Sequence, residues 1–212
     1  MNILKPQKIL FNNLRKVEVL DLELAENNKL FSISVDNYKN ENMSISDVTI
    51  EKSVMNSVEI INGKLENNTF IDIKFNCCNF SNTSFENSSF IRCEFNNCKL
   101  TGCNLVDSRI YNVGFVESNI NYANFSMASI ENVLFKKASL RNSSFQENKF
   151  KNIIFKETDL TQVQIFKTNL KGIDFSDSII DGINVSIEDI RGAIIDQLQA
   201  IDLMYLLGVK IK

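Results

Sequence analysis

Cysteine is the residue type in this sequence with the widest chemistry, because thiolates act both as nucleophiles and as zinc ligands. There are five cysteines: Cys77, Cys78, Cys93, Cys98 and Cys103. The last three are spaced by five residues and superficially resemble a thiolate cluster. Four of the five, however, fall on one small inward position of a five-residue repeat, so we interpret them as core residues. An odd count without an export signal also favours a reducing cytoplasm.

Other familiar catalytic arrangements are missing from the sequence. The 212 residues include no histidine, which excludes Ser-His-Asp and Cys-His catalysis and histidine-based metal sites. No glycine-rich phosphate loop is present, and the carboxylates do not form a glycosidase-like pair. The sequence therefore predicts that the protein is not an enzyme and uses no cofactor or metal. Function is expected to lie in binding through the outer surface.

A five-residue repeat dominates the sequence. Every fifth residue from Leu65 to Phe175 is Phe, Leu or Ile, and apolar residues keep the same phase back to Ile45 and forward to Ile195. A period of five fits neither an α-helix nor a flat strand, so the chain must turn once per repeat. This predicts an all-β solenoid in which the central residues point to one axis. Because the register does not slip, we expect no projecting loop.

Two further features of the repeat indicate the size of one coil. The residue two positions before each centre is mostly Cys, Ser, Thr or Ala, as close packing beside a large centre requires. Centres twenty residues apart include an unbroken series of phenylalanines, which we interpret as an aromatic stack in the core: Phe75, Phe95, Phe115, Phe135, Phe155 and Phe175. Four repeats per coil, and about seven coils, follow.

This pattern, a small residue, any residue, Phe or Leu and then any two residues, resembles that of the pentapeptide-repeat family. The resemblance implies a right-handed quadrilateral β-helix with about twenty residues per coil. We expect a single domain over residues 1–212, made of an irregular N-terminal cap (1–44), the β-helix (45–195) and a C-terminal helix and tail (196–212). Within the cap, residues 17–24 most resemble a strand.

The C-terminal segment is expected to form a capping helix over residues 197–207. Asp196 is a suitable N-cap and Gly208 a suitable stop. The helix is apolar over most of its circumference, so one face can close the coil while another is left over. The leftover face predicts a homodimer; the alternative is a monomer whose helix only caps. The expected interface residues are Leu198, Ile201, Met204, Tyr205, Leu207 and Val209.

Two columns of outward positions are candidate partner-binding surfaces. Ile71, Ile91 and Tyr111 follow their centres at intervals of twenty residues and would form an exposed apolar column. This column is either a partner site or the dock for the N-terminal cap, and the sequence favours neither. If it binds a partner, Tyr111→Asp should abolish binding without unfolding the rod. Leu134 and Ile154 form a shorter apolar pair.

The second column carries acidic residues at Glu117, Glu157 and Asp177, with Lys137 between the first two. The whole sequence has 23 basic and 26 acidic residues, a net charge of −3. No basic face is available for phosphates, which disfavours direct binding of nucleic acid. No segment is apolar and long enough to span a membrane or direct secretion.

Several segments resemble the quinolone-resistance pentapeptide proteins, the Qnr family: residues 101–108 (TGCNLVDS), 121–126 (NYANFS), 170–176 (LKGIDFS), 188–193 (EDIRGA), 199–200 (QA) and 206–209 (LLGV). The resemblance implies a cytoplasmic dimeric rod that binds DNA gyrase and topoisomerase IV, relieves quinolone inhibition and is able to inhibit gyrase itself. In that family the rod has been viewed as imitating duplex DNA.

The uninterrupted register makes the chain similar to the loop-less Qnr members from Gram-positive bacteria. A near-neutral rod, however, does not favour a purely electrostatic imitation of DNA. Two alternatives remain open. One is immunity against a peptide toxin that acts on gyrase, and the other is a structural scaffold that binds an unrelated protein through the Ile71, Ile91 and Tyr111 column.

Overall fold

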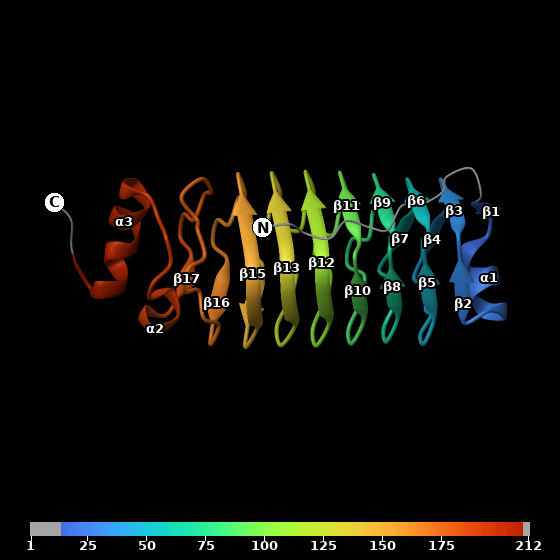
Figure 1. The fold of residues 1–212 in the computed structure, drawn as a ribbon, viewed down its shortest axis with the longest axis horizontal. Coiled ribbons are helices and arrows are strands. Elements are labelled where there is room, and N and C mark those ends of the chain that lie inside the picture. Colours follow the sequence, from blue (N-terminus) through green and yellow to red (C-terminus); the bar gives the residue numbers. More distant parts are fainter. Residues whose placement is uncertain (1–13, 210–212) are drawn as a thin grey trace.

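The repeat folds into a straight rod, seen in a computed structural model that describes residues 14–209. The rod is a β-solenoid of about eight turns, with one short helix at its N-terminal end and two at its C-terminal end (Figure 1). Paired strands are parallel and twenty residues apart along most of the rod, as in the pair Phe95 and Phe115. The predicted all-β solenoid with four repeats per coil is confirmed, but there are about eight turns rather than seven, because residues before Ile45 also form a regular coil.

Most strands belong to one parallel sheet that covers two adjacent sides of the coil. Its members are β1 (Arg15–Val17), β2 (Lys29–Phe31), β3 (Ile33–Asp36), β5 (Thr49–Glu51), β6 (Val54–Asn56), β8 (Thr69–Ile71), β9 (Lys74–Asn76), β10 (Ser89–Ile91), β11 (Glu94–Asn96), β12 (Arg109–Val116), β13 (Ser129–Lys136) and β15 (Lys149–Lys156). The long strands β12, β13 and β15 run around the corner between these sides, which ties the sides together in the middle of the rod.

The other two sides are built from shorter pairings and isolated bridges. The strands there are β4 (Lys39–Glu41), β7 (Glu59–Ile61), β14 (Ser144–Gln146), β16 (Gln164–Phe166) and β17 (Asn184–Val185). The helices are α1 (Leu20–Glu26), α2 (Ile187–Ile190) and α3 (Gln197–Leu203), and a 3-10 turn over Met204–Leu207 follows α3. Within residues 14–209, none of these helices is long and apolar enough to cross a bilayer.

The central residues of the repeats fill the axis of the rod. The predicted aromatic stack is confirmed: consecutive rings from Phe75 to Phe175 lie 4.5 to 5.4 Å apart between centroids and within 16° of parallel. Phe80 and Phe85 pack edge-on against their neighbours in the same coil. The rings are therefore held by stacking between coils and, for some of them, by edge contacts within a coil, both favourable arrangements for aromatic pairs.

The small inward position also carries hydrogen bonds, which the sequence pattern did not reveal. The hydroxyl of Ser88 donates to the Leu65 carbonyl at 3.0 Å and accepts the Asn68 N–H at 3.1 Å. Thr83 makes the same pair of bonds with Ile60 and Gly63. A side chain at this position thus satisfies backbone groups of the preceding coil that face the dry interior.

The corners of the coil explain the abundance of asparagine. Every fifth residue from Ser32 to Lys167 has a φ between 50° and 70°, in the left-handed region. Asparagine, aspartate and glycine adopt this conformation most readily, because other side chains meet the backbone there. At Gly102, whose φ is 70°, an added Cβ would lie 2.5 Å from Asn82 Oδ1, so the Asn82 side chain would have to move to admit a larger residue.

The N-terminal end differs from the sequence prediction in two ways. Residues 29–44 are not an irregular cap but part of a regular coil, since β2 pairs with β5 and β4 pairs with β7 in register. The repeat is hidden here because the sizes are exchanged: Tyr38 occupies the small position and Asn40 the centre, joined by a hydrogen bond of 2.9 Å. Residues 1–13 of the predicted cap lie outside the described residues.

The predicted strand over residues 17–24 is also wrong. Strand β1 ends at Val17 and helix α1 begins at Leu20. The helical spacing of four places Leu20 and Leu24 on one buried face. The helix thus presents two leucines to the core, as the open end of a solenoid requires.

The C-terminal helix is confirmed at the predicted place. Asp196 and Gln199 form a reciprocal capping box, and Gly208 ends the 3-10 turn with a φ of 69°. Gln199 is also buried, and its Nε2 donates to the carbonyls of Phe175 and Ser178 at 2.9 and 2.6 Å. One glutamine therefore caps the helix and satisfies carbonyls of an earlier coil. Residues 210–212 of the predicted tail lie outside the described residues.

Candidate partner-binding surfaces

The apolar column of Ile71, Ile91 and Tyr111 is assembled as its spacing predicts. The three residues end β8 and β10 and lie in β12, and they are direct neighbours across the sheet. All three side chains are half-buried, and the guanidinium of Arg109 lies 5.6 Å from the centroid of the Tyr111 ring. The column is thus a short apolar strip on the long side of the rod.

An ion pair lies at each end of this apolar column. Glu51 precedes Ile71 in the same line and pairs with Lys29 at 3.6 Å. Glu131 follows Tyr111 and pairs with Lys151 at 2.7 Å. The apolar pair Leu134 and Ile154 is likewise assembled, as neighbours between β13 and β15, and both are half-buried.

The acidic column does not form a continuous negative stripe. Glu117, Lys137, Glu157 and Asp177 are all exposed, and the first three have a left-handed φ of 51° or 52°. Lys137 Nζ lies 3.7 Å from Glu157 Oε2, so the two charges largely offset each other. Asp177 Oδ1 accepts the backbone N–H of Glu157 at 3.3 Å.

Charge pairing between coils is general along the rod. Eight of the nine ion pairs among the described residues join one coil to the next, and the ninth, Arg15 with Glu23, joins β1 to α1. The most buried is Asp72, which is 1% exposed and accepts two bonds from Arg92 at 2.6 and 2.7 Å. The hydrogen bond to Asp72 raises the pKa of the Arg92 guanidinium. Such pairing leaves little net field at a distance.

The C-terminal segment presents the largest set of exposed apolar side chains. Leu198 is 74% exposed and Leu207 is 63% exposed, while Ile201, Tyr205 and Val209 are about half exposed. Met204, the sixth predicted interface residue, is half-buried. Tyr205 is anchored, because its hydroxyl donates to the Ile183 carbonyl and leaves the ring facing outward. Leu203 and Leu206 pack against the core instead.

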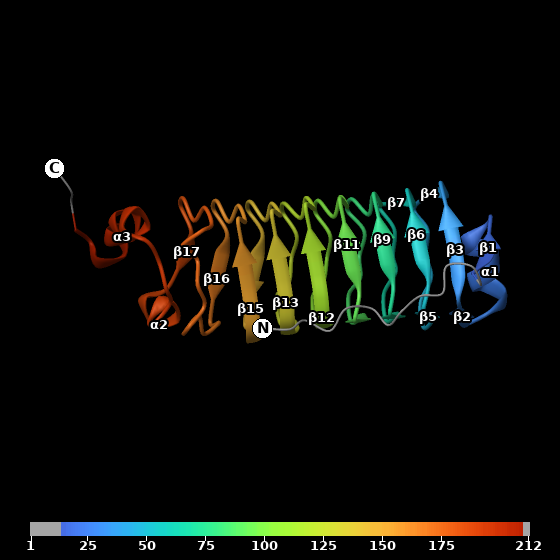
Figure 2. The ribbon, with the colours of Figure 1, turned by 45° about the horizontal axis from the view of Figure 1, so that its top comes forward.

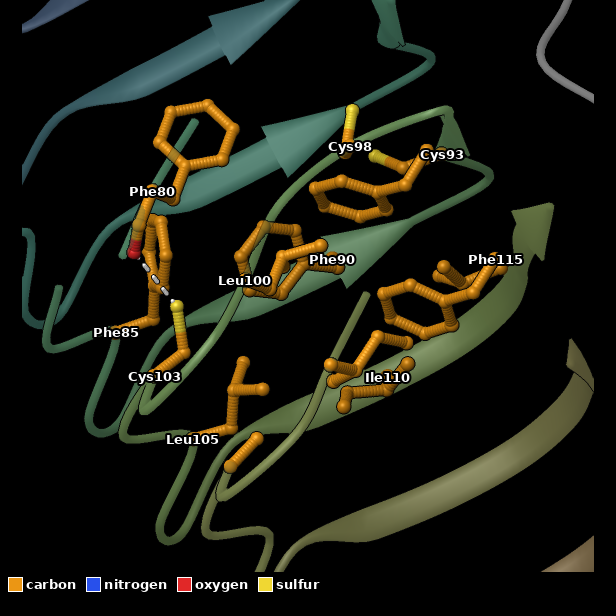
Figure 3. Packing of buried hydrophobic residues seen from close by; sticks show 14 of the residues in the cluster. Phe80, Phe85, Phe90, Cys93, Cys98, Leu100, Cys103, Leu105, Ile110 and Phe115 are labelled. Atoms are coloured by element: carbon orange, nitrogen blue, oxygen red, sulfur yellow. Dashed lines mark hydrogen bonds between the residues drawn. The ribbon is translucent and has the colours of Figure 1, made fainter. Parts of the chain in front are cut away.

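Four of the five cysteines are buried core residues, whereas Cys77 is exposed at a corner. Cys93 and Cys103 are fully buried, which raises the pKa of each thiol to about 12. Their Sγ atoms donate to the carbonyls of Phe70 and Phe80 at 3.4 and 2.9 Å, and Figure 3 shows the second of these bonds. For Cys98, the hydrogen bond with Cys78 together with burial raises the pKa.

Among residues 14–209, no three His, Cys, Asp or Glu side chains gather as a metal site would require. The four buried thiols occupy the same hydrogen-bonding position as Ser88 and Thr83. The candidate surfaces on the described part of the chain are the two outer columns and the exposed C-terminal face.

Comparison with known proteins agrees with the coils just described. Residues 88–165 match the family model described as "Pentapeptide repeat region", and no curated protein matches the chain. HetL from the cyanobacterium Nostoc, a pentapeptide repeat protein involved in heterocyst differentiation regulation, is 12% identical with a TM-score of 0.49, over 85% of this chain and 98% of that one.

Two structures of QnrB1, a plasmid-mediated fluoroquinolone resistance protein, are also similar. A trypsin-treated form is 18% identical with a TM-score of 0.44, over 87% of this chain and 99% of that one. The full-length form is 17% identical with a TM-score of 0.41, over 85% and 100%. The family match spans β12, β13 and β15, and the same register continues on both sides of it.

Proposed function

We propose that this pentapeptide-repeat protein binds the type II topoisomerases DNA gyrase and topoisomerase IV and protects them from fluoroquinolones. The observation that carries the proposal is the resemblance of its C-terminal segments to the Qnr family, because these segments build the last coils and the capping helix: residues 170–176, 188–193 and 206–209. Gly172 and Gly192 in these segments have φ values of 79° and 80°, and the Gly172 N–H donates to the Gly192 carbonyl at 2.8 Å.

The shape of the rod supports this proposal. Among the described residues, no loop interrupts the coils between Ile45 and Ile195 (Figures 1 and 2). A straight, polar rod whose described helices lie at its ends offers a partner a long contact surface of constant cross-section, as a nucleic-acid duplex does. An enzyme that grips duplex DNA is a suitable partner for such a surface.

The charge of the rod indicates that shape contributes more than long-range attraction. The net charge is only −3, and one of the three acidic residues in the column of Glu117, Glu157 and Asp177 is paired with a lysine, Glu157 with Lys137. We therefore expect the affinity for gyrase to fall by less than about tenfold between low and physiological salt. A DNA-like polyanion would lose about 10³-fold or more over such a range.

The decisive experiment is gyrase supercoiling at a fixed inhibitory fluoroquinolone concentration while the protein is titrated. With the drug present, we expect supercoiling to recover when a low concentration of the protein is added. Without the drug, we expect supercoiling to decline at high concentrations of the protein, because the rod then occupies the enzyme. If the protein neither rescues supercoiling from the drug nor inhibits it, the proposal is wrong. Rescue from a gyrase-directed peptide toxin without rescue from the drug would identify an immunity protein instead.

A matched pair of charge reversals locates the contact. The double variant Glu117→Lys with Asp177→Lys changes two exposed corner residues sixty positions apart. Asp47→Lys with Asp107→Lys makes the same charge change, at the same spacing, on the diagonally opposite corner, where both residues are exposed with left-handed φ. We expect the first variant to lose protection and the second to keep it. Equal behaviour of the two variants would rule out contact at the acidic corner.

We also propose that the exposed C-terminal face forms an isologous homodimer. Leu198, Ile201 and Leu207 are more than half exposed, a clustering of large apolar side chains that a monomer seldom leaves in water. Sedimentation equilibrium at micromolar concentration tests this: the wild type should sediment at twice the chain mass of 24.2 kDa. A wild-type protein that sediments at the mass of one chain would overturn the dimer proposal.

A further inference from the structure

One junction between coils is hydrogen-bonded on only two of the four sides of the rod. Strand β15 pairs with β13 towards the N-terminal end and, among the described residues, with no strand on its other edge. Within the described chain, no backbone hydrogen bond joins residues 149–157 to residues 169–177, which lie one coil further along. The coils just before β15 are joined on these two sides by full strand pairing, as β12 is to β13. We name the unbonded junction between residues 149–157 and 169–177 the seam.

The other two sides of the rod remain bonded at the same junction. The N–H groups of Leu160 and Gln162 donate to the carbonyls of Ile179 and Asp181 at 2.7 and 2.8 Å. On the next side, β14, β16 and β17 pair in register. The two bonded sides meet at the corner of Gln162, and the two unbonded sides meet at the corner of Gly172, which is diagonally opposite.

The packing at the seam is also looser than elsewhere in the rod. At Gly172 an added Cβ would meet no atom within 4 Å, whereas at Gly182 it would lie 3.3 Å from a side chain of the preceding coil. The rings of Phe155 and Phe175, which face each other across the seam, are 5.4 Å apart at 16°, the widest spacing and the largest angle in the aromatic stack. Phe150 is a central residue, yet it is only half-buried.

Side chains close the two ends of the seam. The Asn148 N–H donates to Thr168 Oγ1 at 3.0 Å, and the Thr158 N–H donates to Ser178 Oγ at 3.1 Å. Both acceptors lie at small inward positions, so these bonds hold the coils together next to the bonded sides. Between them, around the corner of Gly172, the strand pairing that joins other coils is missing.

We propose that the seam is a hinge: the coils from residue 169 onward tilt about the bonded corner of Gln162, and the seam opens and closes at the corner of Gly172. Continuous backbone bonding resists separation at the first corner, while a ring contact and a few side-chain bonds resist it at the second, and regions with few such contacts open most readily. The inference is independent of the topoisomerase proposal, because it concerns motion within one chain.

The hinge has a consequence for the end of the rod. The tilting unit carries the exposed apolar residues of the C-terminal face, among them Leu198, Ile201 and Leu207. The angle of the hinge therefore sets the direction in which this face points relative to the long sides of the coils before the seam.

Distances between pairs of nitroxide labels, measured by double electron–electron resonance, test the hinge in the full chain. The background is Cys77→Ser, which removes the exposed thiol and leaves the four buried ones. Ser89→Cys with Asn169→Cys, the unbonded-side pair, crosses the seam. Lys99→Cys with Ile179→Cys, the bonded-side pair, crosses the same junction on a bonded side. Each pair spans four strand steps, about 19 Å at ~4.8 Å per step.

A third pair controls for the position of the labels. Thr69→Cys with Lys149→Cys lies in the line of the unbonded-side pair and also spans four steps, but it ends before the seam. We expect this control and the bonded-side pair to give narrow distance distributions. The unbonded-side pair should give one at least about twice as broad, with a tail that extends by about 5 Å, one strand spacing.

Two results would overturn the proposal. A narrow distribution for the unbonded-side pair would do so even at a longer mean distance, because a fixed gap is not a hinge. Equal broadening of the bonded-side pair would do so as well, because the coils would then separate around the whole circumference and not about one corner.

Discussion

Two serines in the same inward column provide a sharp test of what holds the coils together. Ser88 and Ser108 are both almost fully buried. If the small position is selected for size alone, replacement of either by alanine should cost little, since Ala123, Ala128 and Ala138 occupy the same kind of position. If the hydroxyl satisfies the backbone of the preceding coil, the two replacements should differ.

The structure gives the expected difference. Ser88 Oγ accepts a hydrogen bond from the Asn68 N–H at 3.1 Å, and within residues 14–209 no carbonyl accepts one from that N–H. The N–H of Ser88, in contrast, donates to the Phe85 carbonyl of its own turn at 3.1 Å, so it does not need the Ser108 hydroxyl as an acceptor. Ser88→Ala therefore leaves a buried donor unpaired and should cost about 2–3 kcal/mol, whereas Ser108→Ala loses one bond to Leu105 and should cost about 0.5–1 kcal/mol.

Urea unfolding followed by circular dichroism measures both free energies of unfolding. With an m-value of about 2–3 kcal/mol/M, the midpoint should fall by about 1 M for Ser88→Ala and by about 0.3 M for Ser108→Ala. Ser88→Cys should lie between wild type and alanine, because thiols already fill this position at Cys93 and Cys103. Equal losses for the two alanine variants would refute the hydrogen-bonding role and leave size as the determinant.

Four further outcomes follow from the same geometry. Buried Cys103 has a pKa of about 12, so its neutral thiol stabilises the fold fully below about pH 8.5 and less at each higher pH; Cys103→Ser should reduce this alkaline loss by up to about 1.4 kcal/mol per pH unit in urea titrations, and an unchanged slope would contradict it. Met127 is half exposed and has a φ of 61°; its replacement by Asn should raise the free energy of unfolding by about 0.5–1 kcal/mol, whereas its replacement by Ala should not. Phe115→Ala, in the middle of the stack, should cost about 3–5 kcal/mol and Phe115→Leu less than about 2, and equal losses would deny the stack its role. Leu198→Asp should halve the sedimenting mass without altering the circular dichroism spectrum, whereas an unchanged mass would place any dimer contact elsewhere.

The core could be predicted from the sequence because each coil repeats the same physical demand. Phe95 and Phe115 are stacked in space for the reason that makes them recur in the sequence: both are centres of the same side. The C-terminal helix was predictable for a local reason, since Asp196 and Gly208 are strong cap and stop signals that act within a few residues.

The N-terminal coil escaped prediction because its packing exchanges the two inward positions. A large Tyr38 and a smaller Asn40, joined by a hydrogen bond, occupy the positions that a small residue and a Phe or Leu occupy elsewhere, so the letter pattern is lost. Helix α1 lacked a signal of another kind, because Val19 at its N-cap offers no side-chain hydrogen bond. Burial of Leu20 and Leu24, rather than capping, defines that helix.

The candidate surfaces were predictable as columns but not in their environment. Register alone places Ile71, Ile91 and Tyr111 next to one another. Whether an outward residue is exposed is not given by the repeat: Asn112 is buried, whereas Asn152, two coils further along the same line, is exposed. The pairing of Asp72 with Arg92 similarly needed the twenty-residue stacking of corner residues to be known.

Packing constrains three of the five positions in each repeat, which narrows where function can be encoded. The centre fills the axis, the small position satisfies the neighbouring coil, and the corner must adopt a left-handed φ. The remaining two positions are free to serve binding. So are the corners whose residue is poorly suited to a left-handed φ. Tyr122 is such a corner: its φ is 61° and its side chain is 63% exposed, so the strain of about 1 kcal/mol is not offset by burial. Residues that stability alone would not select are therefore the first to substitute when the binding face is mapped, and Tyr122→Asn should raise stability whether or not it weakens binding.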